Sequence, residues 1–374
     1  MSAVKLSVFL SDSGEIDFPI FLNDPRVTIC NNNPNYDPYQ RNPEYTYIHG
    51  IGFSPLLGVM REKRAIRRCA NAVGGVLLSY LVLSYIFPNL VMGIMSLLFP
   101  HYQGYYMPDA VYELITFATM ILSLCVPFFV YAMCIRIPMR TALPLKAPEF
   151  SIVIPAVFIC FGASTVAAFG SGLLQSMLSW IGIYAPGNLG EMPTSTGTAT
   201  VLYLINSTLV PAFLEEFVFR GVLMQSLRRF GDAFAVLTSA ILFAVAHGNL
   251  MVFPIAFSVG LCIGYFVIRT GSLWTGIIVH FLYNSLSVGL NELFMVLSYN
   301  AGMILDSAVV IVELLLALLS LVYLAHTRPR MFALRPAQTT LGEKTKLQSF
   351  FSSVLIIVTL VVFLVMTIVG LRVY

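Results

Sequence analysis

Apolar and polar positions alternate along this chain in long blocks. Nine apolar blocks are candidate membrane-spanning helices, because about 20 apolar residues wound as a helix cross the roughly 30 Å hydrocarbon core of a bilayer. These blocks cover residues 71–99, 110–134, 152–182, 198–227, 232–249, 252–268, 271–298, 303–325 and 350–371. Lipid cannot satisfy the backbone of an open strand edge, so the pattern predicts an all-α fold, a polytopic transmembrane helix bundle of about eight or nine spans.

The first part of the chain has a different pattern. Residues 1–60 are polar and turn-rich, and the stretch 31–45 has too few apolar residues to offset the entropy of ordering a core. The basic cluster at 61–68 directly precedes the first apolar block, where a cytoplasmic anchor is expected. We therefore expect a polar, largely disordered N-terminal segment with a basic anchor, residues 1–70, and a transmembrane domain, residues 71–374. A partner-binding tail is the alternative for the N-terminal segment.

The composition narrows the class of protein. Hydrophobic residues make up 58% of the chain and charged residues 10%. Ordinary soluble domains have roughly 45–50% and about 25%, so a soluble globular enzyme is excluded. The net charge of +3 is small and the cations lie in short loops, which indicates a lipid bilayer as partner and no nucleic acid. The 6 cysteines have no CxxC or metal-ligand spacing, so no disulfide framework or zinc site follows from them.

The positions of the cations predict the orientation in the membrane. Lysine and arginine occur in the loops that follow the even-numbered apolar blocks and are absent from the loops between them. Cytoplasmic loops carry the excess of positive residues. We therefore expect a multi-pass protein of the cell (cytoplasmic) membrane, with its N-terminus inside and the end of the last span outside.

Ionisable residues interrupt the fourth apolar block. Glu215, Glu216 and Arg220 lie near its middle, where each charge costs about 2.5–3.5 kcal/mol on insertion scales. Glu216 and Arg220 are four residues apart and share a helix face, whereas Glu215 points about 100° away. The pattern predicts a Glu216–Arg220 pair and a second carboxylate that is free to face a cavity. A purely structural ion pair is the alternative.

Two histidines also lie inside apolar blocks. Glu216 lies 15 residues before Gly231 and His247 lies 16 residues after it, so regular helices place both at nearly the same depth, roughly 23 Å from that turn. His280 is followed one turn later by Asn284, but the same count puts His280 only about 15 Å from the inner end of its helix. It meets the carboxylates only if the helices are staggered or tilted. A hydrogen-bonded structural role is the alternative for each histidine taken singly.

Carboxylates, imidazoles, an amide and a guanidinium together suit three classes of function. The first is hydrolysis of a peptide bond by water, in which a carboxylate takes the proton and other side chains donate to the oxyanion. The second is a metal site, and the third is a proton-coupled carrier. The sequence has no His-Glu-x-x-His, Gly-x-Ser-Gly or Gly-x-Gly-Asp, so the zinc, serine and aspartyl signatures of intramembrane proteases are absent. A glutamate-centred site remains.

Three short motifs resemble those of the CAAX protease and bacteriocin-processing (CPBP, or Abi) family of intramembrane proteases, which includes the Ras-converting CAAX endoprotease. They are Glu-Glu-x-x-x-Arg at Glu215, Glu216 and Arg220, Phe-x-x-x-His at Phe243 and His247, and His-x-x-x-Asn at His280 and Asn284. Each motif alone is a weak signal, but all three occur in order on successive predicted helices. The resemblance covers about 198–290. The family core has about eight helices, so a ninth span is a departure, most easily placed at the C-terminal end.

The resemblance implies an intramembrane glutamate-type endopeptidase. In this mechanism Glu215 is the general base on a water molecule that His247 helps to position. His280 and Asn284 form the oxyanion hole, and no covalent intermediate is expected because water is the nucleophile. The implied substrate is a membrane-associated peptide or protein. The alternatives are a non-catalytic CPBP-like immunity or scaffold protein and a proton-coupled transporter, although no inverted repeat supports the transporter.

The resemblance also implies roles for the remaining motif residues. Glu216 with Arg220 shapes and charge-balances the site, and Phe243 sets the orientation of the His247 ring by packing. We expect no cofactor, and a divalent metal such as zinc is the alternative.

Other acids inside the apolar blocks have a structural interpretation first. Glu113 lies near a span end and can reach the interface. We expect Asp306, Glu313 and Glu292 to pair with polar groups of neighbouring helices, and the alternative is that they line a hydrated substrate path.

Overall fold

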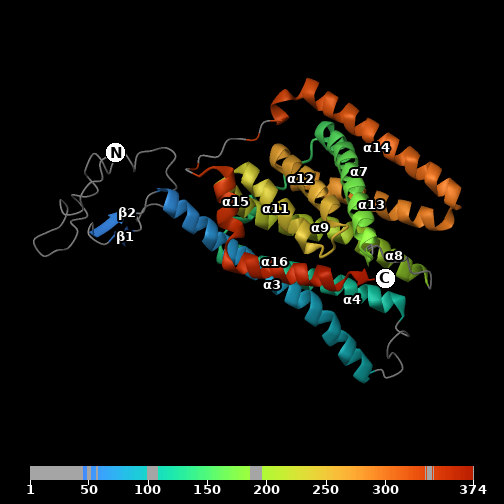
Figure 1. Cartoon of the computed structure of the whole chain (residues 1–374), viewed down its shortest axis with the longest axis horizontal. Coiled ribbons are helices and arrows are strands. Elements are labelled where there is room, and N and C mark those ends of the chain that lie inside the picture. The colour runs from blue at the N-terminus through green and yellow to red at the C-terminus, as the bar shows by residue number, and fades with distance from the viewer. Residues whose placement is uncertain are drawn as a thin grey trace, which may run out of the picture.

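The computed structural model of this chain describes residues 45–48, 52–55, 58–98, 108–185, 196–332, 334, 339 and 341–373. Almost all of these residues are helical, and the helices pack against one another (Figure 1). The predicted all-α transmembrane fold is confirmed. The expectation of a disordered leader falls, for residues 1–44, outside the described residues. Strands β1 (Tyr45–Ile48) and β2 (Gly52–Pro55), which the sequence pattern did not predict, form an antiparallel hairpin.

The helical elements differ in length and regularity. The separate helices are α3 (Gly58–Leu98), α7 (Phe150–Trp180), α11 (Asp232–Ala246), α12 (Phe253–Thr270), α13 (Leu273–Val296), α14 (Tyr299–Thr327), α15 (Glu343–Phe351) and α16 (Val354–Val369). Two rods are composite: α4 (Asp109–Met120), η4 (Ile121–Cys125) and α5 (Val126–Cys134); then α8 (Gly197–Leu204), η5 (Ile205–Leu209), α9 (Val210–Glu215), η6 (Glu216–Leu223), α10 (Met224–Leu227) and η7 (Arg228–Phe230). The short elements are α6 (Met139–Ala142), β3 (Ile183–Tyr184), η8 (Pro329–Phe332) and β4 (Arg372–Val373).

The prediction of nine spans needs correction. Within the described part of the chain, 7 helices are long and apolar enough to cross a membrane, or 8 if the bent pair α15–α16 is one span. Helix α11, the fifth predicted span, has 15 residues, which at 1.5 Å per residue gives about 22 Å. It ends early because Gly248, with φ +60°, adopts the left-handed conformation that closes helices. This is a multi-pass membrane protein, and its orientation stays a prediction.

Two predicted boundaries also differ from the structure. Helix α3 has 41 residues and runs through the basic cluster 61–68, since that cluster contains only residues that a helix accepts. At the other end of the chain, residues 343–351 form α15, which is bent by 72° from α16. Lys346 on α15 is fully buried and its Nζ donates to the carbonyl of Phe230 at 2.7 Å. Helix α15 is thus packed beneath the turn that joins η7 to α11.

Helices α3 and α16 lie side by side although they come from opposite ends of the chain (Figure 1). A Cβ added at Gly74 would lie 2.6 Å from the backbone of Leu355, so the two helices are in backbone contact there. The Thr359 hydroxyl donates to the Gly74 carbonyl at 3.0 Å. Glycine at this position therefore fixes where α16 can sit.

Prolines explain two of the π-helical segments. In each composite rod, a π-helical segment ends two residues before a proline: η4 precedes Pro127 and η5 precedes Pro211. Proline has no N–H, and its ring clashes with the carbonyl four residues back. A wider turn before the ring relieves the clash, and local π adjustments of this kind let membrane helices keep their prolines.

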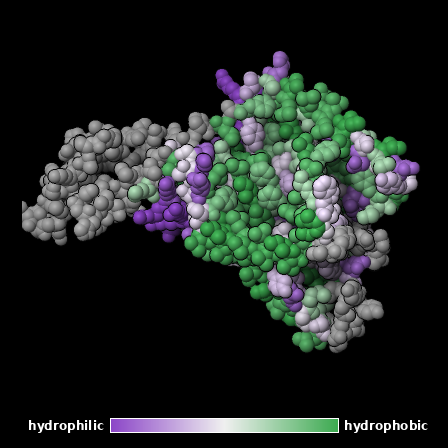
Figure 2. All heavy atoms as spheres, in the orientation of Figure 1, coloured by the Kyte–Doolittle hydropathy of each residue, from purple (hydrophilic) through white to green (hydrophobic). Residues whose placement is uncertain are grey.

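The outer surface suits a lipid environment. Large apolar side chains are exposed along most helices, and they cover much of the face shown in Figure 2. Among the described residues the fully buried charged and polar side chains are few, and the two largest are Arg220 and Lys346. A buried arginine in an apolar protein directs attention to the interior around η6.

Candidate active site

Three segments near the centre of the bundle bring the motif residues together: α9–η6, the end of α11, and α13 (Figure 1). The charged residues of the first motif lie where α9 ends and the π-helical turn η6 begins. A π-helical turn leaves the normal backbone pattern, and such turns are frequent at functional sites. Its carbonyls find side-chain donors here: Ser239 of α11 donates to Phe219 at 3.1 Å, and Gln225 donates to Arg220 at 3.2 Å.

The predicted pair of Glu216 with Arg220 is present. Arg220 Nη1 donates to Glu216 Oε1 at 2.8 Å, and both side chains are fully buried. His280 Nδ1 lies 2.9 Å from the same carboxylate oxygen. The sequence left open whether His280 reaches the depth of the carboxylates, and the structure shows that it does. A buried carboxylate that accepts from two donors is far less costly than an isolated one.

The pair is nevertheless incompletely satisfied. Glu216 Oε2 and the Nε and Nη2 atoms of Arg220 are buried and have no hydrogen-bond partner among the described residues. The Arg220 guanidinium instead lies 4.2 Å from the centre of the Phe243 ring. A desolvated cation over an aromatic face gains about 2 kcal/mol. Phe243 thus supplies part of what the missing hydrogen bonds would provide.

Phe243 also contacts both histidines. Its ring centre lies 4.7 Å from that of His247 and 5.9 Å from that of His280, and both contacts are nearly perpendicular. Phe219 packs on the same ring at 5.2 Å. The sequence predicted only the contact with His247. The contact between Phe243 and Arg220 was missed because η6 and α11 are separate elements whose packing no spacing rule reveals.

Glu215 differs from its neighbour as the helix geometry predicted. Its side chain keeps 19% of its surface exposed, whereas that of Glu216 is fully buried. Its Oε2 lies 3.9 Å from His280 Nε2, which is too far for a hydrogen bond. Glu215 therefore has an accessible carboxylate beside a buried, fixed pair.

His247 caps the C-terminal end of α11. Its Nδ1 lies 2.8 Å from the carbonyl oxygen of Phe243. A carbonyl oxygen can only accept, so Nδ1 carries the hydrogen, and in the neutral ring Nε2 is then an acceptor. The described residues place no hydrogen-bond partner on Nε2, and no direct bond joins His247 to Glu215.

Asn284 lies one turn after His280 on α13 and is partly exposed. It makes no hydrogen bond with another described residue, so its amide is available. One turn before His280 on the same helix, Gly276 has a role that the sequence did not indicate. A Cβ at Gly276 would lie 2.8 Å from Glu216 Oε2. The only signal in the sequence was its spacing of four residues from His280.

The fit of a metal ion can be tested on the donor set. Within the described ranges no three histidine, cysteine, aspartate or glutamate side chains lie close enough together to hold a metal ion. Arg220 also occupies the carboxylate oxygen that His280 shares, and a cation competes with a metal there. The side chains present do not fit a metal centre. The metal-free chemistry itself stays a prediction.

The other intramembrane acids have mixed outcomes. Glu113 was expected to reach the interface, but it is buried and accepts from Asn206 at 2.7 Å, because α8–η5 packs beside α4. Glu313 accepts from Thr165 of α7, as predicted. Glu292 accepts from its sequence neighbour Asn291 at 3.4 Å and also lies within electrostatic range of Tyr203 on α8. Asp306 is exposed and has no hydrogen-bond partner among the described residues, so pairing with a neighbouring helix is wrong for Asp306.

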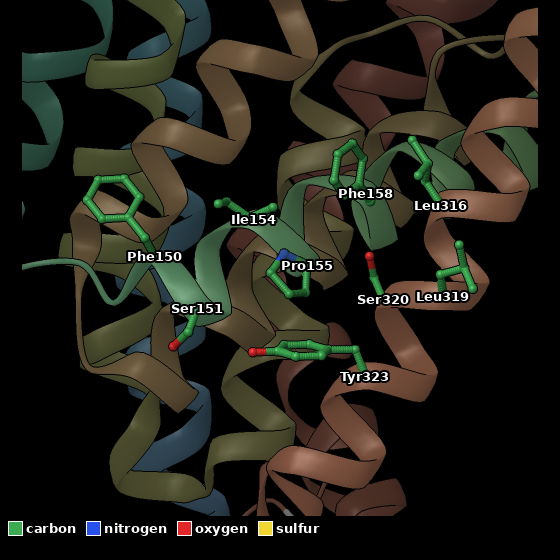
Figure 3. A pocket seen from close by; sticks show the side chains of 9 residues that line it. All are labelled: Phe150, Ser151, Ile154, Pro155, Phe158, Leu316, Leu319, Ser320 and Tyr323. Carbon is green, nitrogen blue, oxygen red and sulfur yellow. The ribbon is translucent and has the colours of Figure 1, made fainter.

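A groove between α7 and α14 lies apart from these residues. Figure 3 shows that its lining comes from one face of each of the two helices. It has a volume of about 330 Å³ and is lined by Phe150, Ser151, Ile154, Pro155, Phe158, Leu316, Leu319, Ser320 and Tyr323. None of the motif residues lines it, and Tyr323 is the one titratable side chain in its lining. The candidate site is therefore the cluster around Glu216 and not this groove.

Comparison with known proteins bears on this cluster. Residues 197–286 match a family model described as type II CAAX prenyl endopeptidase Rce1-like. The match covers about a quarter of the chain and runs from the first residue of α8 to beyond Asn284. No curated protein and no solved structure matched the chain. The match agrees with the resemblance carried by the three motifs: residues 197–286 are similar to the Rce1-like type II CAAX prenyl endopeptidases.

Proposed function

We propose that this protein is a glutamate-type intramembrane endopeptidase that hydrolyses a peptide bond in a membrane-associated peptide or protein. The observation that carries the proposal is the difference in environment between two adjacent carboxylates. Glu216 is buried and held by Arg220 and His280, whereas Glu215 is accessible and without a hydrogen-bond donor. A general base must be free to accept a proton and must be close to the reacting groups.

The attacking water would lie between Glu215 and His247. Both offer acceptors: the Glu215 carboxylate and His247 Nε2, which is left as the acceptor because Nδ1 donates to Phe243. Water has two hydrogens, so one points to each acceptor and an oxygen lone pair points away from both. Glu215 removes one hydrogen as the water oxygen bonds to the substrate carbonyl carbon. The bound proton later passes to the departing amine nitrogen when the C–N bond breaks, which yields a carboxylic acid and an amine.

His280 and Asn284 would stabilise the oxyanion. Glu216 Oε1 faces His280 Nδ1 and accepts its hydrogen. For His280 to donate through Nε2 as well, the ring must carry a second hydrogen. An imidazolium at His280 gives the group of Glu215, Glu216, Arg220 and His280 a net charge of zero, which is the favourable state for buried ionised groups. The Asn284 amide supplies a second donor one turn further along α13.

The family match and the location support a choice of substrate class. The matching family is named for action on CAAX prenyl substrates, so a prenylated peptide with a C-terminal CAAX sequence is the first substrate to test. Arrival of the substrate from the bilayer agrees with a site inside a bundle whose outer surface is apolar. The cell membrane is the proposed location, with the N-terminus inside.

The test uses the purified full-length protein in liposomes with an internally quenched farnesylated CAAX peptide. Wild-type protein and the control Glu313→Gln are expected to cleave the peptide, because Glu313 accepts from Thr165 of α7 and belongs to none of the three motifs. Glu215→Gln is expected to lose at least 1,000-fold in kcat, since it removes the base that activates water. Retained cleavage by Glu215→Gln contradicts the mechanism. Binding without cleavage by wild type supports the scaffold alternative, and Glu215-dependent proton flux supports the transporter.

If wild type leaves this peptide intact, comparison of membrane peptides identifies other substrates. Cells that lack the protein are compared with cells that express wild type or Glu215→Gln. New peptide termini that require wild type identify the substrate. Their complete absence would overturn the proposed activity.

A further inference from the structure

The turn that carries His247 is held by helices outside the motif-bearing segment. His247 ends α11, and Gly248 to Val252 lead into α12. Thr367 of α16 places its Oγ1 3.1 Å from the carbonyl oxygen of Gly248, the residue next to His247. Ser171 of α7 donates to the carbonyl of Met251 at 2.8 Å. Hydroxyl groups from two other helices, α16 and α7, thus bind Gly248 and Met251 in the turn that begins at His247, the proposed water-binding residue.

These contacts matter because the carbonyls of Gly248 and Met251 accept from no backbone N–H among the described residues, whereas those of Asn249 and Val252 accept from α12. Helix α11 stops at Ala246, and Gly248 adopts φ +60°. The last carbonyls of a helix have no partner within it and need one from elsewhere. Within a membrane bundle there is little water to provide that partner. The Thr367 hydroxyl is the donor that the structure supplies to Gly248.

Thr367 is itself firmly located. Helix α16 contacts α3 through Thr359 and Gly74 near its start, and after α16 strand β4 pairs with β3, which directly follows α7. The Thr367 hydroxyl also lies 2.9 Å from the carbonyl of Phe363 in its own helix, so its single hydrogen is shared between two acceptors. Both ends of α16 are therefore anchored, and the position of Thr367 does not depend on its bond to Gly248.

We propose that Thr367 is a positioning residue for His247 and that α16 is an accessory brace of the catalytic site. The inference rests on the proposed function in one respect, the role of His247 in holding water. Helix α16 lies outside residues 197–286, so the family match does not assign it this role. The geometry gives the ninth predicted span, which the motifs left unexplained, a place in the mechanism.

The direction in which His247 Nε2 points depends on how the end of α11 is held. The His247 ring is fixed at Nδ1 by Phe243 of its own helix and at its face by the Phe243 ring. These contacts move together with α11. The packing of Phe243 on Phe219 and Arg220 holds the helix one turn before His247, and the turn after His247 holds it from the other side. A displacement of about 1 Å at a reacting group can cost 100-fold in rate. Loss of one hydrogen bond to the turn is expected to lower kcat about tenfold.

The experiment compares three variants of the full-length protein in liposomes. Thr367→Val removes the hydroxyl but keeps the shape, and Thr367→Ser keeps the hydroxyl. Thr359→Val is the matched control, because Thr359 makes the same kind of hydroxyl bond from α16 to Gly74 of α3. With the farnesylated CAAX peptide, Thr367→Val should lower kcat about tenfold with KM unchanged. Thr367→Ser and Thr359→Val should keep the wild-type kcat.

A second measurement does not require cleavage. The chain has 5 histidines, so ¹⁵N-histidine labelling gives a simple spectrum, in which the signals of His247 are identified by their loss in His247→Gln. Thr367→Val should shift the His247 ring nitrogens and leave those of His280 in place, whereas Thr367→Ser should shift neither. Unchanged His247 signals in Thr367→Val overturn the proposal. It is also overturned if Thr359→Val shifts the His247 signals as much as Thr367→Val does, or if Thr367→Val shifts His280 as much as His247. If wild type cleaves no peptide, the proposed function fails. The NMR measurement still shows whether Thr367 positions His247.

Discussion

Gly276 leaves the space that the Glu216 carboxylate occupies. A Cβ at position 276 would lie 2.8 Å from Glu216 Oε2, and also 2.8 Å from a methyl group of Val267. Contacts this short do not persist, so Gly276→Ala must displace Glu216 or the helix. We expect at least a tenfold loss of kcat and a loss of about 1–3 kcal/mol in the free energy of unfolding, as is usual for overpacked interiors. Peptide cleavage and thermal unfolding in detergent measure the two effects.

Gly289→Ala is the control on the same helix. A Cβ at Gly289 would meet no atom within 4 Å, and alanine is favoured over glycine in a helix by about 1 kcal/mol. This variant should keep full activity and be slightly more stable. If Gly276→Ala behaves in the same way, the space at Gly276 has no role in placing Glu216.

Variants of the buried pair of Glu216 and Arg220 test its effect on stability separately from its effect on catalysis. Glu216→Gln leaves the fully buried guanidinium of Arg220 without a countercharge, which should lower the free energy of unfolding by about 3–5 kcal/mol. The double variant Glu216→Gln/Arg220→Met replaces the pair with neutral groups and should regain most of that stability. It should remain inactive, because His280 then has no carboxylate at Nδ1. Chemical unfolding followed by peptide cleavage tests both statements, and an active double variant would show that the pair serves the fold alone.

Phe243 is expected to matter for activity beyond its packing. Phe243→Leu removes the contact with Arg220 and the two perpendicular contacts with His247 and His280. Such aromatic pairs gain about 0.5–1.5 kcal/mol each beyond buried area. Phe234→Leu is the control, since Phe234 is equally buried on α11 and packs on Phe350 at 5.9 Å, away from the motifs. Both variants should lose similar stability, but only Phe243→Leu should lower kcat, by about tenfold or more.

Chelators should leave the activity unchanged. The described residues contain no group of three metal-ligating side chains close enough to hold a metal ion, and the buried carboxylate of Glu216 is already paired with Arg220. Prolonged dialysis of the protein against EDTA or 1,10-phenanthroline, followed by the cleavage assay, measures this. Loss of cleavage that added zinc restores would replace glutamate chemistry with metal chemistry at this site.

The sequence predicted the composition of the site better than its geometry. The Glu216–Arg220 pair followed from helical spacing, because both residues lie on one helix and neighbours at i and i+4 meet there. The contacts of His280 with Glu216 and of Phe243 with Arg220 join different helices. Such contacts depend on tilt and stagger, which hydropathy does not encode.

A local turn, and not hydropathy, decides whether residues 232–249 form a membrane span. Residues 232–249 are apolar enough for a span, but Gly248 ends α11 after 15 residues. Nearer the C-terminus, the charged residues of 343–351 predicted a basic loop, but these residues form α15. The reason is that Lys346 is buried and donates to the carbonyl of Phe230. Hydropathy describes which residues avoid water. It does not predict where a helix ends, because that depends on the backbone conformation of single residues such as Gly248.

The buried pair of Asn206 and Glu113 should stabilise the fold and take no part in catalysis. Asn206 Nδ2 donates to the Glu113 carboxylate at 2.7 Å and to its backbone carbonyl at 2.8 Å, and both side chains are buried. Asn206→Leu leaves that carboxylate without its donor and should cost about 1–3 kcal/mol. The double variant Asn206→Leu/Glu113→Met removes donor and acceptor together and should recover most of the loss, a coupling that a double-mutant cycle of unfolding measures directly. Cleavage by the double variant should match wild type. Recovered stability without recovered cleavage would instead place Glu113 on a path that the substrate or a proton uses.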